Sequence, residues 1–160
     1  MNLFNCSTFK HFTIPPSLMV IRLATLLTCS LFLNSSLQAE QLIKAEGYSI
    51  HYNAFNTSML DPEVVNKYGI ERSTTLGIVN ISVLDESDKA VSALLLGEAK
   101  NAISQLTTLE FKKITEGKAI YFIATFNFAD AETLNFDITV VPDGMTKRIK
   151  LNFSQQFFKE

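Results

Sequence analysis

The fold is decided by the stretch Ile120-Tyr121-Phe122-Ile123-Ala124-Thr125-Phe126-Asn127-Phe128. Apolar side chains alternate along it, and one side of the extended chain carries Ile120, Phe122, Ala124, Phe126 and Phe128. Burying a phenylalanine side chain is worth about 1.5–3 kcal/mol, so exposing three of them would cost about as much as the net stability of a domain. The stretch therefore predicts a central β-strand with its aromatic side turned into a core.

The same alternation of apolar and polar residues recurs on both sides of this stretch. It predicts further strands over residues 48–55, 79–83, 109–113, 134–140 and 149–153. The last two are separated by Pro142-Asp143-Gly144, a sequence typical of a tight turn, so they are expected to form a hairpin.

Residues 90–106 fit two patterns. Their apolar positions match a helical stripe, but those of 90–99 also alternate as in a strand. Gly97 would cost roughly 1 kcal/mol inside a helix. We therefore interpret 90–99 as a strand, with room for one helical turn from Asn101 to Leu106.

One short helix is expected between the first two strands. Asp61 is a suitable N-cap, Pro62 fits the first helical position, and Gly69 is a typical stop after Tyr68. These signals predict a two-turn helix over residues 62–68.

About seven short strands and one short helix predict an all-β fold, an immunoglobulin-like antiparallel β-sandwich. The cysteine and tryptophan hallmarks of antibody domains are absent from the corresponding segments. A small open barrel is the alternative.

The chain begins with a pattern typical of export. The basic flank Leu18–Arg22 leads into an apolar run, Leu23–Leu33, and small Ala39 follows. The charge-free segment from Leu23 to Leu37 holds 15 residues, whereas a stable membrane span needs about 20. The sequence thus predicts a cleavable signal peptide within an N-terminal segment 1–39, a periplasmic location and no stable membrane anchor.

Two alternatives concern this N-terminal segment. Lys10 and the Pro15-Pro16 pair are unusual ahead of a signal peptide, so translation starting at Met19 is an alternative to Met1. A lipidated Cys29 is the other alternative, but Thr28 is larger than the residue that normally precedes such a cysteine, and the apolar run continues beyond it. Cys6 and Cys29 both precede Ala39, which leaves the mature chain without a disulfide.

Residues 40–160 have the length of a single domain that can bury a core without disulfides. This segment holds all 16 acidic residues and 12 of the 14 basic ones, so its net charge is 12 minus 16, or −4. Nucleic-acid binders instead concentrate Lys and Arg on one face. A nucleic-acid partner is therefore not expected.

Catalytic and metal-binding motifs are not recognisable in this segment. His51 is its only histidine and has no neighbouring ligand cluster, so it is interpreted as a polar strand residue. A thiol and a Gly-x-Ser-x-Gly motif are both missing. Asp85, Glu86 and Asp88 lie in an expected turn, which favours a solvated loop over a calcium site. We expect no enzyme activity, no cofactor and no metal site.

Binding is the remaining chemistry, and it points to the region around the expected helix. If the helix folds back on the first strand, aromatic, amide and charged side chains would line a shallow groove. The candidate binding residues are Tyr48, His51, Tyr52, Phe55, Asn56, Tyr68 and Arg72. The competing interpretation is a small satellite core beneath the helix.

A resemblance to a known family is carried by short segments of the mature chain: 51–56, 60–64, 68–73, 80–83, 109–111, 116–121 and 132–136. Together they resemble one bacterial family, known as domain of unknown function 4426. The resemblance implies a small secreted protein of the periplasm of Gram-negative bacteria, and it brings no established activity, cofactor or catalytic residue.

Two function classes follow. The first is a non-enzymatic binding or assembly module that recognises a periplasmic protein or peptide by surface contacts or strand pairing. The second is a small-molecule or ion binder, or an enzyme, that uses a pocket between the sheets or under the short helix. A purely structural role in the envelope is a third possibility.

Overall fold

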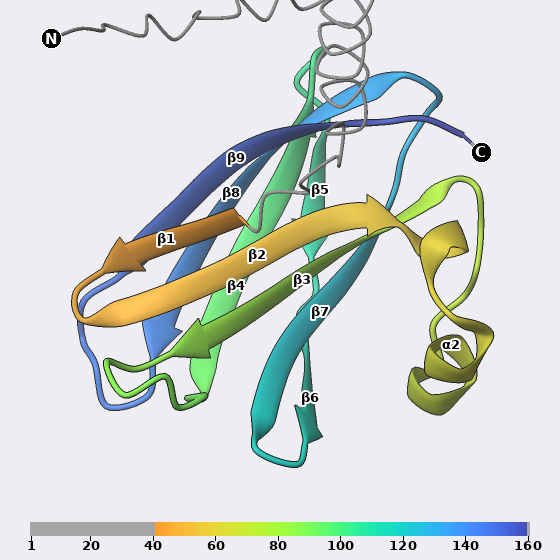
Figure 1. Ribbon diagram of the computed structural model, residues 1–160. Helices are drawn as coiled ribbons and strands as arrows, with labels where there is room; N and C mark the ends of the chain where they lie inside the picture. The colour runs from red at the N-terminus through yellow and green to blue at the C-terminus, as the bar shows by residue number, and fades with distance from the viewer. Residues whose placement is uncertain (1–40, 160) are drawn as a thin grey trace, which may run out of the picture. The chain divides into compact units, whose positions relative to one another are not determined.

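A computed structural model describes residues 41–159. Over this range nine strands form two antiparallel sheets that pack face to face (Figure 1). The expected leader, residues 1–39, and its cleavage site lie outside the described residues.

The first sheet has the order β1-β2-β3-β7-β6. Its strands are β1 Gln41–Ala45, β2 Tyr48–Asn56, β3 Leu76–Leu84, β7 Ala119–Asn127 and β6 Lys112–Glu116. The second sheet has the order β5-β4-β8-β9. Its strands are β5 Leu106–Leu109, β4 Ala93–Asn101, β8 Glu132–Pro142 and β9 Ile149–Phe157. Between β2 and β3 lie the 3-10 turn η2, Thr57–Met59, and the helix α2, Pro62–Tyr68. The predicted sandwich is confirmed.

The core fills the space between the sheets. The side chains of β7 and of the residue after it share one side, as expected: Phe122, Ala124, Phe126 and Phe128 are buried in the core cluster, and the partly buried Ile120 packs against it. From the opposite sheet they meet Phe136, Ile138 and Leu151. Alternation in the strands thus defines the inner faces of both sheets.

Aromatic rings gather at one end of this core. Phe126 contacts Phe136 and Phe157 edge to face, with ring centroids 5.2 and 5.1 Å apart. Phe136 stacks on Phe153 at 4.6 Å. Such ring pairs contribute about 0.5–1.5 kcal/mol beyond the area they bury.

The strand count exceeds the expected seven for two reasons. Residues 41–45 form β1, a short edge strand that sends Ile43 and Ala45 toward the core. The expected strand 109–113 is wrong as a single element, because the chain changes sheets at Glu110–Phe111. Its first part ends β5 and its second part begins β6.

The ambiguous segment is a strand, as predicted, although β4 begins at Ala93 and extends to Asn101. The residues that follow make a tight turn rather than a helix. Gln105 N donates to Asn101 Oδ1 at 2.9 Å, and Asn101 N donates to Gln105 O at 3.1 Å. Leu106 then enters β5.

Candidate functional site

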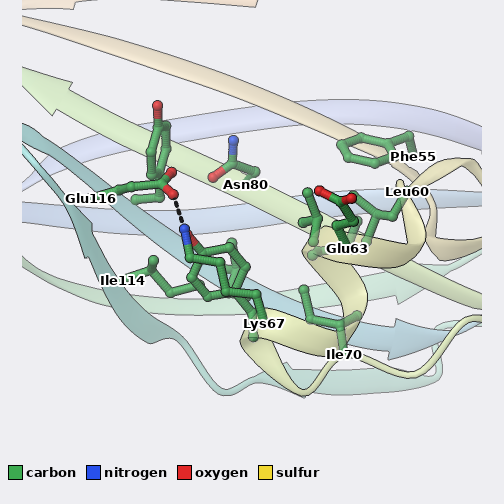
Figure 2. Close-up of a pocket in the computed structure, with 13 residues that line it drawn as sticks. Phe55, Leu60, Glu63, Lys67, Ile70, Asn80, Ile114 and Glu116 are labelled. Atoms are coloured by element: carbon green, nitrogen blue, oxygen red, sulfur yellow. Dashed lines mark hydrogen bonds and ion pairs between the residues drawn. The ribbon is translucent and has the colours of Figure 1, made fainter.

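A pocket opens between α2 and the outward face of the five-stranded sheet (Figure 2). Its volume is about 350 Å³, at the lower end of the roughly 300–1,000 Å³ usual for ligand sites. The strands supply seven lining residues: Phe55, Ile78, Asn80, Ile114, Glu116, Tyr121 and Ile123. The helix and its flanks supply Leu60, Glu63, Val64, Lys67, Tyr68 and Ile70.

The helix forms for the reasons visible in the sequence. Asp61 is the N-cap, and its Oδ1 accepts a hydrogen bond from Glu63 N at 2.8 Å. Pro62 occupies the first turn, and Gly69 ends the helix in the left-handed conformation at φ 63°. The predicted bounds, 62–68, are confirmed.

None of the residues of α2 is buried. The helix is instead held to the sheet by polar contacts at the rim of the pocket. Lys67 pairs with Glu116 of β6, and Lys112 Nζ donates to Tyr68 O at 3.3 Å. Arg72, which follows the helix, donates from Nη2 to Ser58 O, which precedes it, at 2.5 Å and so joins the two flanking segments. Both contacts to the sheet lie at the C-terminal end of α2, so the pocket is walled by an element that is attached at that end and has no buried residue.

The floor of the pocket is apolar because the central strands carry apolar residues on both faces. In β3 and β7 the inward positions belong to the core, while Ile78 and Ile123 point outward. Phe55 lies opposite Ile78 in register, and Ile114 lies opposite Tyr121. Such a floor favours binding of an apolar group.

Two polar atoms interrupt this apolar surface. Asn80 Oδ1, on the floor, and the Tyr68 hydroxyl oxygen, on the helix side, are both buried. Neither makes a close hydrogen bond to residues 41–159, although the Tyr68 hydroxyl lies near enough to the Lys67–Glu116 pair to shift the pKa of both groups. A buried polar atom without a partner costs free energy, so each is a position at which a ligand group gains by binding.

Charge is confined to the rim. Lys67 donates to Glu116, which holds the pKa of the Glu116 carboxyl below its ordinary value, and the nearby Tyr68 hydroxyl acts in the same direction. The same ion pair raises the pKa of Lys67 above its ordinary value. Both side chains are more than half exposed to solvent, so the pair adds little to stability.

Of the seven candidate binding residues, the structure brings two to the pocket, Phe55 and Tyr68. Tyr48 and Tyr52 lie on the inner face of β2 and pack against the core. The Tyr52 ring lies 4.8 Å from that of Phe153, centroid to centroid, across the sandwich. These two tyrosines belong to the packing between the sheets.

The other three candidates are placed away from the pocket lining. His51 lies in β2, in register with Leu42 and Ser82, and is half-buried. Asn56 is buried, and its Nδ2 donates to Phe158 O at 2.7 Å. Arg72 supports the loop before α2 through the Ser58 carbonyl.

Sequence reasoning missed the floor of the pocket. The overlooked residues are Ile78, Asn80, Ile114, Glu116, Tyr121 and Ile123, together with Lys67 on the helix. A signal was present, because Ile78 and Ile123 interrupt the polar side of strands whose other side already supplies the core. An apolar outward face needs a cover, and the short helix provides it.

A second hollow lies at the turn expected to be solvated, between Glu46 and Asp88. Asp85 Oδ1 is already engaged there, accepting from Ser87 N at 2.8 Å and from Lys89 N at 3.0 Å. In the described part of the chain, no group of three or more His, Cys, Asp or Glu is arranged to hold a metal ion.

The model of the DUF4426 family, described as a domain of unknown function, matches residues 43–160. This chain belongs to the DUF4426 family. The crystal structure of a DUF4426 protein from Pseudomonas aeruginosa PAO1 is 32% identical to it, with a TM-score of 0.69. That match covers 78% of this chain and 98% of the Pseudomonas chain.

This DUF4426 chain also shares its fold with FetP of uropathogenic Escherichia coli strain F11, which was expressed in the periplasm for crystallisation. The TM-score is 0.55 at 6% identity, over 76% of this chain and 95% of FetP. A copper-bound variant of FetP gives a TM-score of 0.54, also at 6% identity, over 76% and 97% of the two chains.

No curated protein matches the chain. Among residues 41–159, no helix is long and apolar enough to cross a bilayer.

Proposed function

We propose that this DUF4426 protein is an exported, non-enzymatic binding module of the periplasm, and that the pocket beneath α2 is its ligand site. The observation that carries the proposal is a preformed cavity of about 350 Å³ with an apolar floor and two unpartnered polar atoms. Pockets of this kind are the usual sites of small ligands and of apolar side chains.

The chemistry of the lining favours binding over catalysis. The lining side chains contain no serine, cysteine or histidine, so a serine or cysteine nucleophile activated by a histidine base is missing from the pocket. The two oppositely charged rim groups, Lys67 and Glu116, pair with each other. The lining is therefore suited to holding a ligand, either a small molecule or the apolar side chain of a peptide.

Export is supported by the order of segments along the chain. The basic flank and apolar run end at Ala39, and the first described strand begins at Gln41. The match to the DUF4426 family begins at residue 43. The first described strand and the family match thus both begin just after the expected cleavage site, an order of segments that is typical of a protein that loses a leader during export.

The export part of the proposal is tested by expressing the full chain in a Gram-negative host and fractionating the cells. We expect the protein in the periplasmic fraction, and mass spectrometry should show an N-terminus at Glu40. An uncleaved chain that remains in the cytosol would contradict export.

The binding part is tested with the protein purified from that fraction, by following amide NMR signals as toluene is added. We expect shifts that saturate and cluster at Ile78, Ile114 and Ile123. Val64→Trp places a bulky ring in the pocket wall and should abolish them. Asn66→Trp, on the same helix but outside the lining, is the matched control. Shifts that survive Val64→Trp would place binding elsewhere.

A further inference from the structure

The pocket carries information about the class of ligand, because its polar atoms differ in kind. Asn80 lies in β3, in register with Asn53 on one side and Ile123 on the other. Figure 2 shows it on the floor between Glu116 at one end and Phe55 at the other. Its Oδ1 is a hydrogen-bond acceptor that is buried and unpartnered within the described chain.

The second polar atom is a donor on the opposite wall. The hydroxyl of Tyr68 belongs to α2, is buried, and lies beside the Lys67–Glu116 pair without a close hydrogen bond to any described residue. A hydroxyl group can donate its proton to a carbonyl oxygen. The pocket thus presents an acceptor from the sheet and a donor from the helix around an apolar cavity.

The charges at the rim argue against an ionised ligand. Lys67 is the one cation among the described lining residues, and it is engaged by Glu116. The remaining lining charge, Glu63, is acidic. A carboxylate or phosphate would find no unengaged cation in the lining, and it would meet like charge at Glu63.

We infer that the pocket binds an uncharged apolar molecule that carries an amide group. The ligand N–H donates to Asn80 Oδ1, the ligand C=O accepts from the Tyr68 hydroxyl, and the apolar body lies on Ile78 and Ile123. An amide supplies a donor and an acceptor on one small uncharged group, as the two pocket atoms require. The inference rests on the proposed function and names the chemistry of its ligand, either a free small amide or a peptide bond beside an apolar residue.

The test uses probes that share a ring and differ in the polar group: toluene, N-methylbenzamide and benzoate. Affinities are measured by amide NMR titration of the exported protein. Each net hydrogen bond contributes a factor of roughly 2–12 in affinity. We therefore expect N-methylbenzamide to bind about 5–50-fold more tightly than toluene, and benzoate to bind more weakly than N-methylbenzamide.

Asn80→Leu removes the acceptor while keeping a side chain of similar size. It should reduce the advantage of N-methylbenzamide over toluene by the factor of roughly 2–12 that one hydrogen bond contributes, and it should leave toluene binding intact. Asn53→Leu, at the neighbouring position in register and outside the lining, should keep the advantage. Tyr68→Phe removes only the hydroxyl and provides an independent variant if Asn80→Leu folds poorly. It should reduce the advantage without abolishing it.

The outcomes separate the two proposals. If toluene shifts no pocket residue, the proposed function fails. If toluene binds but N-methylbenzamide binds no more tightly, if benzoate binds as tightly as N-methylbenzamide, or if Asn80→Leu keeps the whole amide advantage, only the inference is overturned. A fourth probe, N-acetyl-leucine methylamide, identifies the source: tighter binding than N-methylbenzamide indicates a peptide ligand, and weaker binding indicates a free amide.

Discussion

Single residues show how closely the two sheets approach. Gly77 in β3 faces the core, and a Cβ atom added there would lie 2.4 Å from a ring carbon of Phe126. That ring is 2% exposed and held by aromatic neighbours, so it has no room to move. The glycine is therefore required by contact with its neighbour.

We expect Gly77→Ala to lower the free energy of unfolding by about 1–3 kcal/mol, the usual cost of overpacking a core. Urea unfolding followed by circular dichroism measures it. Gly97→Ala in β4 is the comparison, because an added Cβ would be less crowded there: its nearest side-chain carbons, from Ile138, Phe111 and Leu109, would lie 3.0–3.3 Å away. We expect a smaller loss at Gly97. Equal losses for the two variants would contradict the packing argument.

At this scale the sequence predicted the core far better than the site. Alternation identifies Phe122 and Phe126 as inward residues because each strand has only two faces. It does not reveal which outward residues a distant helix covers. Asn56 is an example of what the sequence does not reveal. Its side-chain amide was expected to bind a ligand, but it binds the backbone of Phe158, 102 positions away, and no local sequence pattern indicates that partner.

Among the elements, α2 was the easiest to predict and β1, β5 and β6 the hardest. Capping signals are local, so Asp61 and Gly69 mark the ends of the helix by themselves. The sheet change at Glu110–Phe111 depends instead on which partner each strand finds. The alternation of side chains continues through this corner, so the sequence pattern does not reveal that one strand ends there and another begins.

The attachment of α2 to β6 should depend on pH. Because the folded protein holds the pKa of Glu116 below its ordinary value, the pair contributes stability above the unfolded carboxyl pKa. That contribution is lost as the pH falls through the lowered pKa. The raised pKa of Lys67 preserves the pair on the alkaline side. We expect amide exchange of α2 to accelerate on acidification before the core strands respond.

Glu116→Gln should remove this acid-induced step, since it cannot titrate. Glu98→Gln, at an exposed position in β4, is the control and should retain it. Hydrogen exchange of the α2 amides, corrected for the intrinsic pH dependence of exchange, provides the measurement. An unchanged step in Glu116→Gln would show that another group controls the helix.

For the molecule as a whole, stability depends on burial between the sheets. Two adjacent phenylalanines near the C-terminus have the same side chain but differ in burial, so they allow the effect of burial to be measured by itself. Phe157 is 2% exposed and Phe158 is 54% exposed. The Phe157 ring lies 5.1 Å from those of Phe126 and Phe128, centroid to centroid. Phe158 contributes its backbone carbonyl to Asn56 and little side-chain contact.

We expect Phe157→Ala to lower the free energy of unfolding by about 3–5 kcal/mol, a large share of the roughly 5–15 kcal/mol typical of a domain. Phe158→Ala should change it by about 0.5 kcal/mol or less, because an exposed side chain is removed and the carbonyl is kept. Chemical denaturation of both variants gives the comparison. Similar losses would mean that the aromatic cluster does not hold the sheets together.

The corner at Glu110–Phe111 connects the two sheets along one margin of the sandwich. It joins β5 and β6, the edge strands on one side of the sandwich, covalently. On the opposite margin the edge strands are β1 and β9. There the sheets are held together by side-chain contacts, such as that of Tyr52 in β2 with Phe153 in β9. When the protein is heated, or pulled by its two ends, the sheets should therefore begin to separate along the β1–β9 margin. The strands β5 and β6, joined by the corner, should separate last.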